Sequence, residues 1–138
     1  MTFAVELQRS LAALNSMQLS NVSFGSFHAQ LDFSGEFNVS LRIDKNIELL
    51  TEDGLIEIIN IETKQNYGSV GKLVALIGGK VRSVEYLGDS LRVEFEKPMN
   101  ETIVIQLAPT DFDPVQISCV HHMKPRELVW DYVVNAKM

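Results

Sequence analysis

The second half of this sequence repeats the apolar pattern of the first half at an offset of 62 residues. The repeat is carried by apolar positions, while the polar positions between them differ, so the duplicated feature is a supersecondary unit and not an active site. With a further slip of two residues, the frame extends to residues 39–43 and 103–107. The identical pairs are Leu11/Leu73, Ala13/Ala75, Leu14/Leu76, Val22/Val84 and Phe33/Phe95.

Both copies break the strand period at the same place. Apolar residues on one face of a strand recur every second residue, yet Leu19 and Val22 are three residues apart, and so are Val81 and Val84. A break shared by both copies predicts a β-bulge or bend at this point in each of them.

Periodicity also predicts the other elements. Residues 3–14 carry apolar residues at helical spacing, and residues 70–77 carry a shorter helical stripe that Gly78 and Gly79 end. Pro125 in a first helical turn favours a C-terminal helix over residues 124–135. Alternation of apolar and polar residues predicts strands at 29–33, 37–43, 91–95, 103–107 and 115–120.

These elements predict an α+β fold. We expect one domain over residues 1–138, built from two pseudo-repeats at about 3–62 and 70–120 and followed by the C-terminal helix 124–135. Each pseudo-repeat is an internally duplicated helix plus an antiparallel β-meander. Neither copy alone covers its apolar face, so the two units should share one core.

The segment between the copies contains a turn signal. Asp53-Gly54 lies between the β-rich runs 47–50 and 55–61, which is typical of a hairpin. The run 47–50 could alternatively form a helical turn.

Composition limits the functional classes. The chain has 138 residues, 46% of them hydrophobic, which is enough for a sizeable core. The net charge of −6 disfavours nucleic-acid binding, which needs clustered Lys and Arg. No apolar run is long enough to span a membrane. The N-terminus lacks the basic region of a signal peptide, and Cys119 is the only cysteine, so we expect a small soluble protein in the cytoplasm.

The negative charge is concentrated in the first half. Residues 1–69 contain nine acidic and four basic residues, whereas residues 70–138 contain nine and eight. Six of the acids lie between Asp44 and Glu62, where Lys45 is the only base. Mixed with apolar residues, such a segment suits an interface with a basic protein surface. The predicted partner-binding residues are Glu48, Glu52, Asp53 and Glu57.

One short segment resembles a set of metal ligands. Cys119 and His121 would share one face of a strand, with His122 on the other, and Asp111 or Asp113 could add a carboxylate. The spacings typical of zinc sites are missing. We therefore expect no metal, no cofactor and no catalytic residues, and regard the chain as a non-enzyme.

The run 73–81 and the hairpin 88–95, Leu73 to Val81 followed by Gly88-Asp89-Ser90-Leu91-Arg92-Val93-Glu94-Phe95, resemble segments of small bacterial proteins of the toxin-immunity type. Those proteins belong to polymorphic or contact-dependent toxin systems. The resemblance implies an immunity protein, but it carries over no site residue. Ser16-Met17 departs from it, because the first copy has no glycines there.

The functional prediction is therefore an acidic protein-binding module that neutralises a cationic toxin, such as a nuclease with a positive substrate cleft. One alternative is a homodimeric scaffold formed by pairing of sheet edges. The other is a small metal-dependent hydrolase that uses the segment 119–122.

Overall fold

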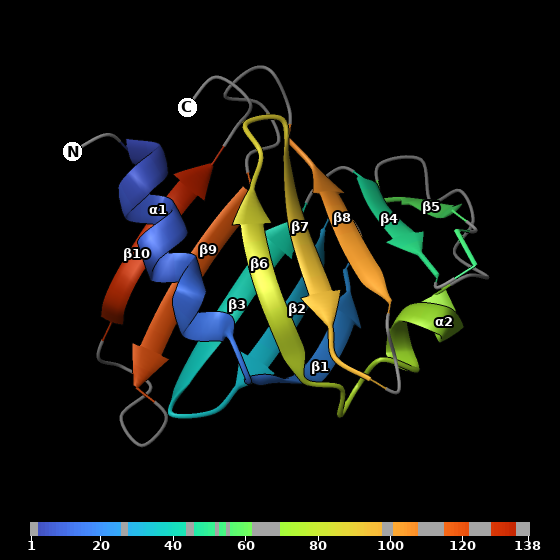
Figure 1. Ribbon diagram of the computed structural model, residues 1–138, viewed down its shortest axis with the longest axis horizontal. Helices are drawn as coiled ribbons and strands as arrows, with labels where there is room; N and C mark the ends of the chain where they lie inside the picture. Colours follow the sequence, from blue (N-terminus) through green and yellow to red (C-terminus); the bar gives the residue numbers. More distant parts are fainter. Residues whose placement is uncertain are drawn as a thin grey trace.

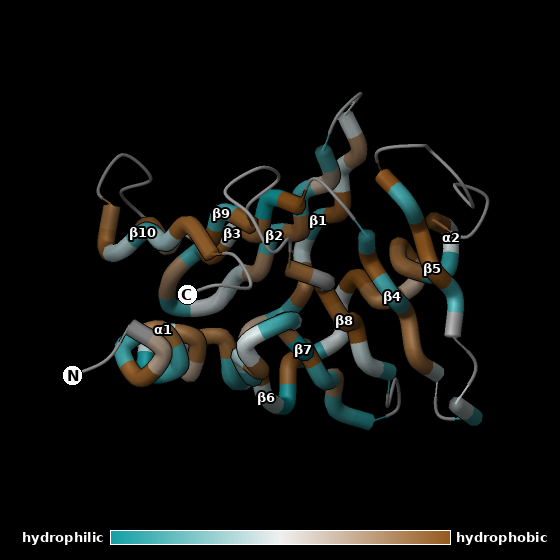
Figure 2. The backbone as a smooth tube through the Cα atoms, turned by 90° about the horizontal axis from the view of Figure 1, so that it is seen from above, coloured by the Kyte–Doolittle hydropathy of each residue, from teal (hydrophilic) through white to brown (hydrophobic). Residues whose placement is uncertain are grey.

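The protein consists mainly of two five-stranded antiparallel sheets that lie face to face (Figures 1 and 2). A computed structural model describes residues 3–25, 28–43, 46–51, 53–54, 56–61, 70–97, 101–107, 115–121 and 128–134. Sheet A contains, in spatial order, β1 (Gln18–Phe24), β2 (Ala29–Ser34), β3 (Phe37–Ile43), β9 (Val115–His121) and β10 (Leu128–Val134). Sheet B contains β5 (Ile56–Asn60), β4 (Asn46–Leu50), β8 (Thr102–Gln106), β7 (Ser90–Phe95) and β6 (Val81–Tyr86).

Each half of the chain contributes strands to both sheets. The meander β1–β2–β3 lies in sheet A, and the hairpin β4–β5 that follows pairs with β8 of sheet B. The meander β6–β7–β8 lies in sheet B, and the hairpin β9–β10 that follows pairs with β3 of sheet A. The two halves therefore exchange hairpins. One cluster of buried apolar side chains takes members from both sheets.

The two meanders have the same register at an offset of 62 residues. Strands β1 and β2 pair with an irregularity between Leu19 and Asn21, and β6 and β7 pair with one between Val81 and Ser83. The predicted bulges are thus confirmed. The two-residue slip in the third strand is wrong, because Leu31 faces position 41 and Val93 faces position 103, which keeps the offset at 62.

The copies meet at the beginnings of β1 and β6, around a pseudo-twofold axis. Gln18 forms an isolated antiparallel bridge with Lys80, its own equivalent in the other copy. Four backbone hydrogen bonds surround this bridge in two related pairs. They run from Ser16 N to Val81 O (2.8 Å), from Gly78 N to Leu19 O (2.8 Å), from Leu19 N to Gly79 O (3.0 Å) and from Val81 N to Met17 O (2.8 Å).

The first helix, α1 (Phe3–Leu11), continues into a 3-10 turn, η1 (Ala12–Leu14), as its apolar spacing predicts. Leu7, Leu11 and Leu14 are fully buried. The helix lies beside β6, in the layer of sheet B (Figure 2). The Gln8 side chain donates to Val84 O (2.7 Å) and accepts from Tyr86 N (2.8 Å), so its amide pairs with the edge of β6 as a neighbouring strand would.

The second helix, α2 (Val70–Val74), is short and contacts β1. Leu73 and Leu76 are its buried apolar residues, whereas Val74 and Ile77 of the predicted stripe are exposed. Gly78 has a φ of +93°, a left-handed conformation that suits glycine after a helix.

The expected α+β class is wrong, because the described helices are short and ten strands make up most of the fold. The expected C-terminal helix 124–135 is also wrong where it is described, since residues 128–134 form β10. Trp130 and Val134 are paired with Cys119 and Val115, which are buried. Its β-branched and aromatic residues favour an extended strand, and β9 offers an edge for it to pair with.

The core assignments from the sequence are confirmed for the residues at the centre of the repeat. Phe33 and Phe95 are each 1% exposed and are the largest fully buried side chains. Each pairs with the residue just before a bulge, Leu19 or Val81. Within the described part of the chain, no helix is long and apolar enough to cross a membrane.

Candidate functional site

The acidic segment forms the hairpin β4–β5, as the turn signal predicts (Figure 1). Glu48 lies on β4, Glu57 on β5, and Asp53 is exposed between the two strands. Glu52 lies outside the described residues. Glu48 pairs with Ile58 and Glu57 pairs with Leu49, so the two glutamates point to opposite faces of the hairpin.

Glu57 points toward α2, where it forms an ion pair with Lys72. The other copy contains the equivalent contact, in which Ser10 Oγ of α1 lies 2.9 Å from the Tyr132 hydroxyl of β10. Ser10 and Lys72 are 62 residues apart, and Glu57 and Tyr132 occupy matching register positions in the exchanged hairpins. The Glu57 side chain is 26% exposed. This glutamate therefore connects the hairpin to its helix.

Glu48 lies on the outer face of sheet B. Across the strands it is flanked by Ile58, which is 42% exposed, and by Val104. The same cross-strand row continues to Arg92 and Glu85. An outward carboxylate beside an exposed isoleucine combines charge with apolar area, which suits a protein interface.

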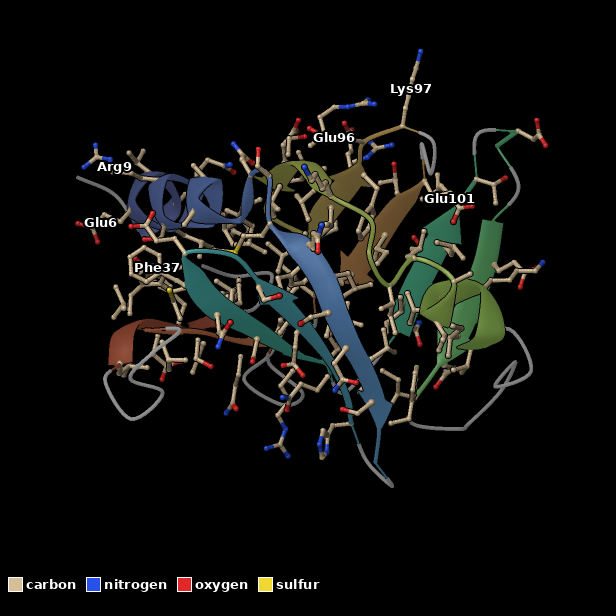
Figure 3. All side chains as sticks on the ribbon, turned by 90° about the horizontal axis from the view of Figure 1, so that it is seen from below. Glu6, Arg9, Phe37, Glu96, Lys97 and Glu101 are labelled. Carbon is tan, nitrogen blue, oxygen red and sulfur yellow. The ribbon has the colours of Figure 1, made fainter. Side chains whose placement is uncertain are left out.

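Lys72 also acts on a carboxyl group that the sequence did not single out. Burial raises the pKa of Glu101 above its ordinary value, and the nearby Lys72 ammonium partly opposes this rise. Glu101 precedes β8 at the position equivalent to the fully buried Val39 of the first copy. The position is therefore apolar in one copy and charged in the other (Glu101 is labelled in Figure 3).

The segment 119–122 offers little support for a metal site. Cys119 is fully buried on the inner face of sheet A, opposite Val39 and Trp130, and burial raises the pKa of its thiol. His121 ends β9, while His122, Asp111 and Asp113 lie outside the described residues. In the part of the chain that is described, no three His, Cys, Asp or Glu side chains gather as metal ligands.

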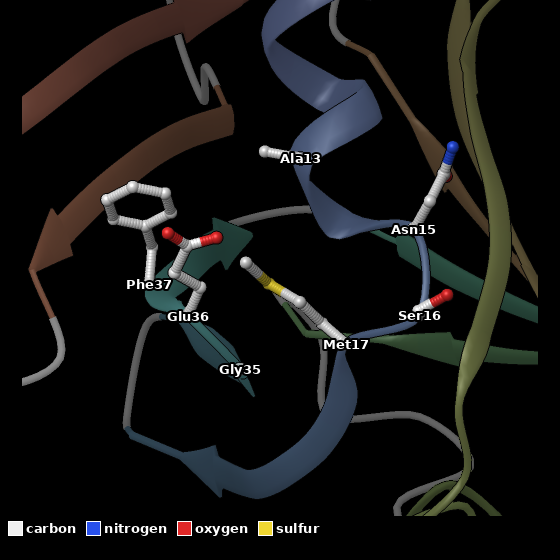
Figure 4. A pocket seen from close by; sticks show the side chains of 7 residues that line it. All are labelled: Ala13, Asn15, Ser16, Met17, Gly35, Glu36 and Phe37. Carbon is white, nitrogen blue, oxygen red and sulfur yellow. The ribbon is translucent and has the colours of Figure 1, made fainter.

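A hollow of about 250 Å³ lies between η1, the start of β1 and the β2–β3 turn (Figure 4). The side chains of Ala13, Met17, Glu36 and Phe37 converge on it, whereas the Asn15 amide and the Ser16 hydroxyl point away. The remaining lining residue is Gly35.

Met17 forms the floor of this hollow and is 4% exposed. A Cβ atom on Gly35 would lie 3.1 Å from Met17 Cγ, so the glycine lets the methionine side chain pack over the turn. Glu36 is exposed, and among the described residues it forms no ion pair.

The second copy has the same backbone here with different side chains. Gly79 stands at the position of Met17 and makes the equivalent hydrogen bonds, and Lys97 stands at the position of Gly35. Lys97 projects from the surface (Figure 3). Only the tertiary structure brings Met17 to the β2–β3 turn. The available sequence signal was the departure of Ser16-Met17 from the glycines of the second copy.

Comparison with protein families, with characterised proteins and with solved structures found no match to this chain.

Proposed function

We propose that this chain is an acidic cytoplasmic protein-binding module that neutralises a toxin domain with a basic surface, such as a nuclease. The role is binding and not catalysis. It needs no cofactor. The observation that carries the proposal is the concentration of six acids against one base between Asp44 and Glu62, in a chain of net charge −6. Such a field accelerates encounter with a cationic partner.

The position of each acid narrows the proposed contact. Glu48 lies on the outer face of sheet B next to the exposed Ile58, and Asp53 is exposed at the turn. Glu57 is ion-paired with Lys72 on the other face. We therefore place the contact on Glu48, Ile58 and Asp53, and give Glu57 a structural role.

The test is a binding measurement with the product of the adjacent gene. The double variant Glu48→Gln/Asp53→Asn should lower the association rate and weaken its dependence on salt, because the removed charges act at long range. Glu57→Gln is the matched control and should change the association rate much less. An unchanged rate and salt dependence in the double variant would exclude the hairpin. If the adjacent gene product does not bind at all, the inhibitor proposal is wrong.

The edge of sheet A favours a second candidate, a homodimeric scaffold. Strand β10 is last in the sheet order and exposes Leu128, Val129 and Val133. Apolar residues on an edge strand promote pairing with another chain. Sedimentation of the wild type and of Val133→Lys tests this candidate, which requires a dimer that the variant dissociates.

A further inference from the structure

We propose that the hollow around Met17 is a second recognition site, which receives one lysine or arginine side chain of a protein partner. It lies at the β2–β3 turn, at the other end of the molecule from the hairpin β4–β5 (Figure 1). The proposal goes beyond the hairpin contact, and it stands on the geometry of the hollow.

The size of the hollow selects a single side chain. Its volume of about 250 Å³ lies below the range of roughly 300–1,000 Å³ that holds a drug-sized ligand. The methyl group of Ala13 and the thioether of Met17 provide apolar walls for an aliphatic stem (Figure 4). Long cationic side chains bury such stems and keep their charged heads near the surface.

The charge of the lining selects a cation. Glu36 provides the only charged group among the lining residues, and its carboxylate points to the same spot as the Phe37 ring (Figure 4). A carboxylate favours an ammonium or guanidinium group, and the face of an aromatic ring attracts the same cations. Met17 adds a polarizable sulfur to this surface.

The second copy explains why the chain has one such site. Gly79 removes the apolar floor that Met17 provides, and Lys97 places a positive charge at the position of Gly35. A cationic side chain would find neither packing nor attraction there. The two copies share a backbone and differ in these side chains, so the recognition is confined to the first copy.

The experiment uses the full chain with isotope-labelled methionine methyl groups. The protein has five methionines, and Met17→Leu assigns the signal of Met17. The probe is Nα-acetyl-arginine methylamide, and the neutral control probe is Nα-acetyl-norleucine methylamide. We expect the arginine probe to shift the Met17 signal with an affinity on the order of 1 mM, and the norleucine probe to bind at least about threefold more weakly.

Two variants test the two parts of the site. Glu36→Gln removes the charge and should weaken binding of the arginine probe at least about threefold. Gly35→Ala keeps the charge, pushes Met17 into the hollow and should also weaken binding. Glu96→Gln, at the β7–β8 turn of the second copy, is the matched control and should bind as the wild type does.

The proposal is overturned if the Met17 signal does not respond to the arginine probe. It is also overturned if both probes shift that signal equally, or if Glu36→Gln and Gly35→Ala bind like the wild type. A urea melt of each variant confirms that it is folded. Because the probe replaces the partner, these outcomes are independent of whether the adjacent gene product binds the hairpin.

Discussion

Ser16 and Gly78 occupy equivalent positions in the two copies and share a left-handed backbone conformation, with φ values of +71° and +93°. Each donates its N–H at 2.8 Å across the pseudo-twofold axis, to Val81 O and Leu19 O respectively. The contact between the copies therefore requires this conformation twice. Glycine adopts it without strain, whereas serine does so at a cost.

Exchanging the residue types at these positions should have opposite effects on stability. Gly78→Ala should lower the free energy of unfolding by about 1 kcal/mol, since strain outweighs the smaller entropy of the unfolded chain. Ser16→Gly should raise it by up to about 1 kcal/mol. Urea melts measure both. Gly71→Ala, in α2 with open space around it, should be stabilising or neutral, which separates backbone strain from loss of glycine.

Phe33 and Phe95 should contribute equally to the core, because they occupy equivalent buried positions beside the two bulges. Truncation of either to Ala should cost on the order of 3–5 kcal/mol in the free energy of unfolding. Denaturant melts check this. A change below about 1 kcal/mol at both sites would contradict the assignment of the inner faces.

The Gln8 amide should stabilise the edge of β6. Gln8→Leu leaves Val84 O and Tyr86 N without the side-chain partner and should cost about 1–3 kcal/mol. Gln8→Glu should be less harmful at low pH, where a protonated carboxyl group can donate to Val84 O as the amide does. Melts at several pH values test this ordering. Gln116→Leu, at an exposed position of β9, provides the control and should have little effect.

Glu101 should make stability depend on pH. Its raised pKa means that the folded protein holds this proton more tightly than the unfolded chain does. The stabilising contribution is therefore full below the ordinary pKa of 4.5 and is lost as the pH rises through the raised value. Urea melts between pH 4 and 7 should show this decline in the wild type, and Glu101→Gln should remove it. Lys72→Met should shift the decline to higher pH, because the opposing charge is gone.

Cys119 should be unreactive in the folded protein. Its side chain is fully buried, and burial raises the pKa of the thiol, so little thiolate is exposed to reagents. Modification by an aromatic disulfide reagent should follow the rate of unfolding and accelerate in urea. As this is the only cysteine, the signal has one source. Rapid labelling without denaturant would show that β9 opens locally.

The sequence by itself predicts the elements that depend on local periodicity. Leu7, Leu11 and Leu14 mark the first helix, and Phe33 and Phe95 mark equivalent core positions, because apolar spacing reports which face is buried. The repeated break after Leu19 and Val81 predicts the two bulges for the same reason.

The tertiary structure decided the features that depend on contacts between distant residues. Strand β10 carries Trp130, Tyr132 and Val134, which suit either a short helix or a strand, and pairing with β9 determined the result. The exchange of the hairpins β4–β5 and β9–β10 likewise depends on the edges of β8 and β3, which local sequence does not specify.

The candidate sites divide in the same way. A count of charges along the chain predicts an acidic segment, since net charge is a property of composition. Pairing of β4 with β5 then places Glu48 and Glu57 on opposite faces, and α2 gives Glu57 a cationic partner in Lys72. The hollow at Met17 was not predictable, because Glu36 and Phe37 reach it only when β1 and the β2–β3 turn meet in the folded chain.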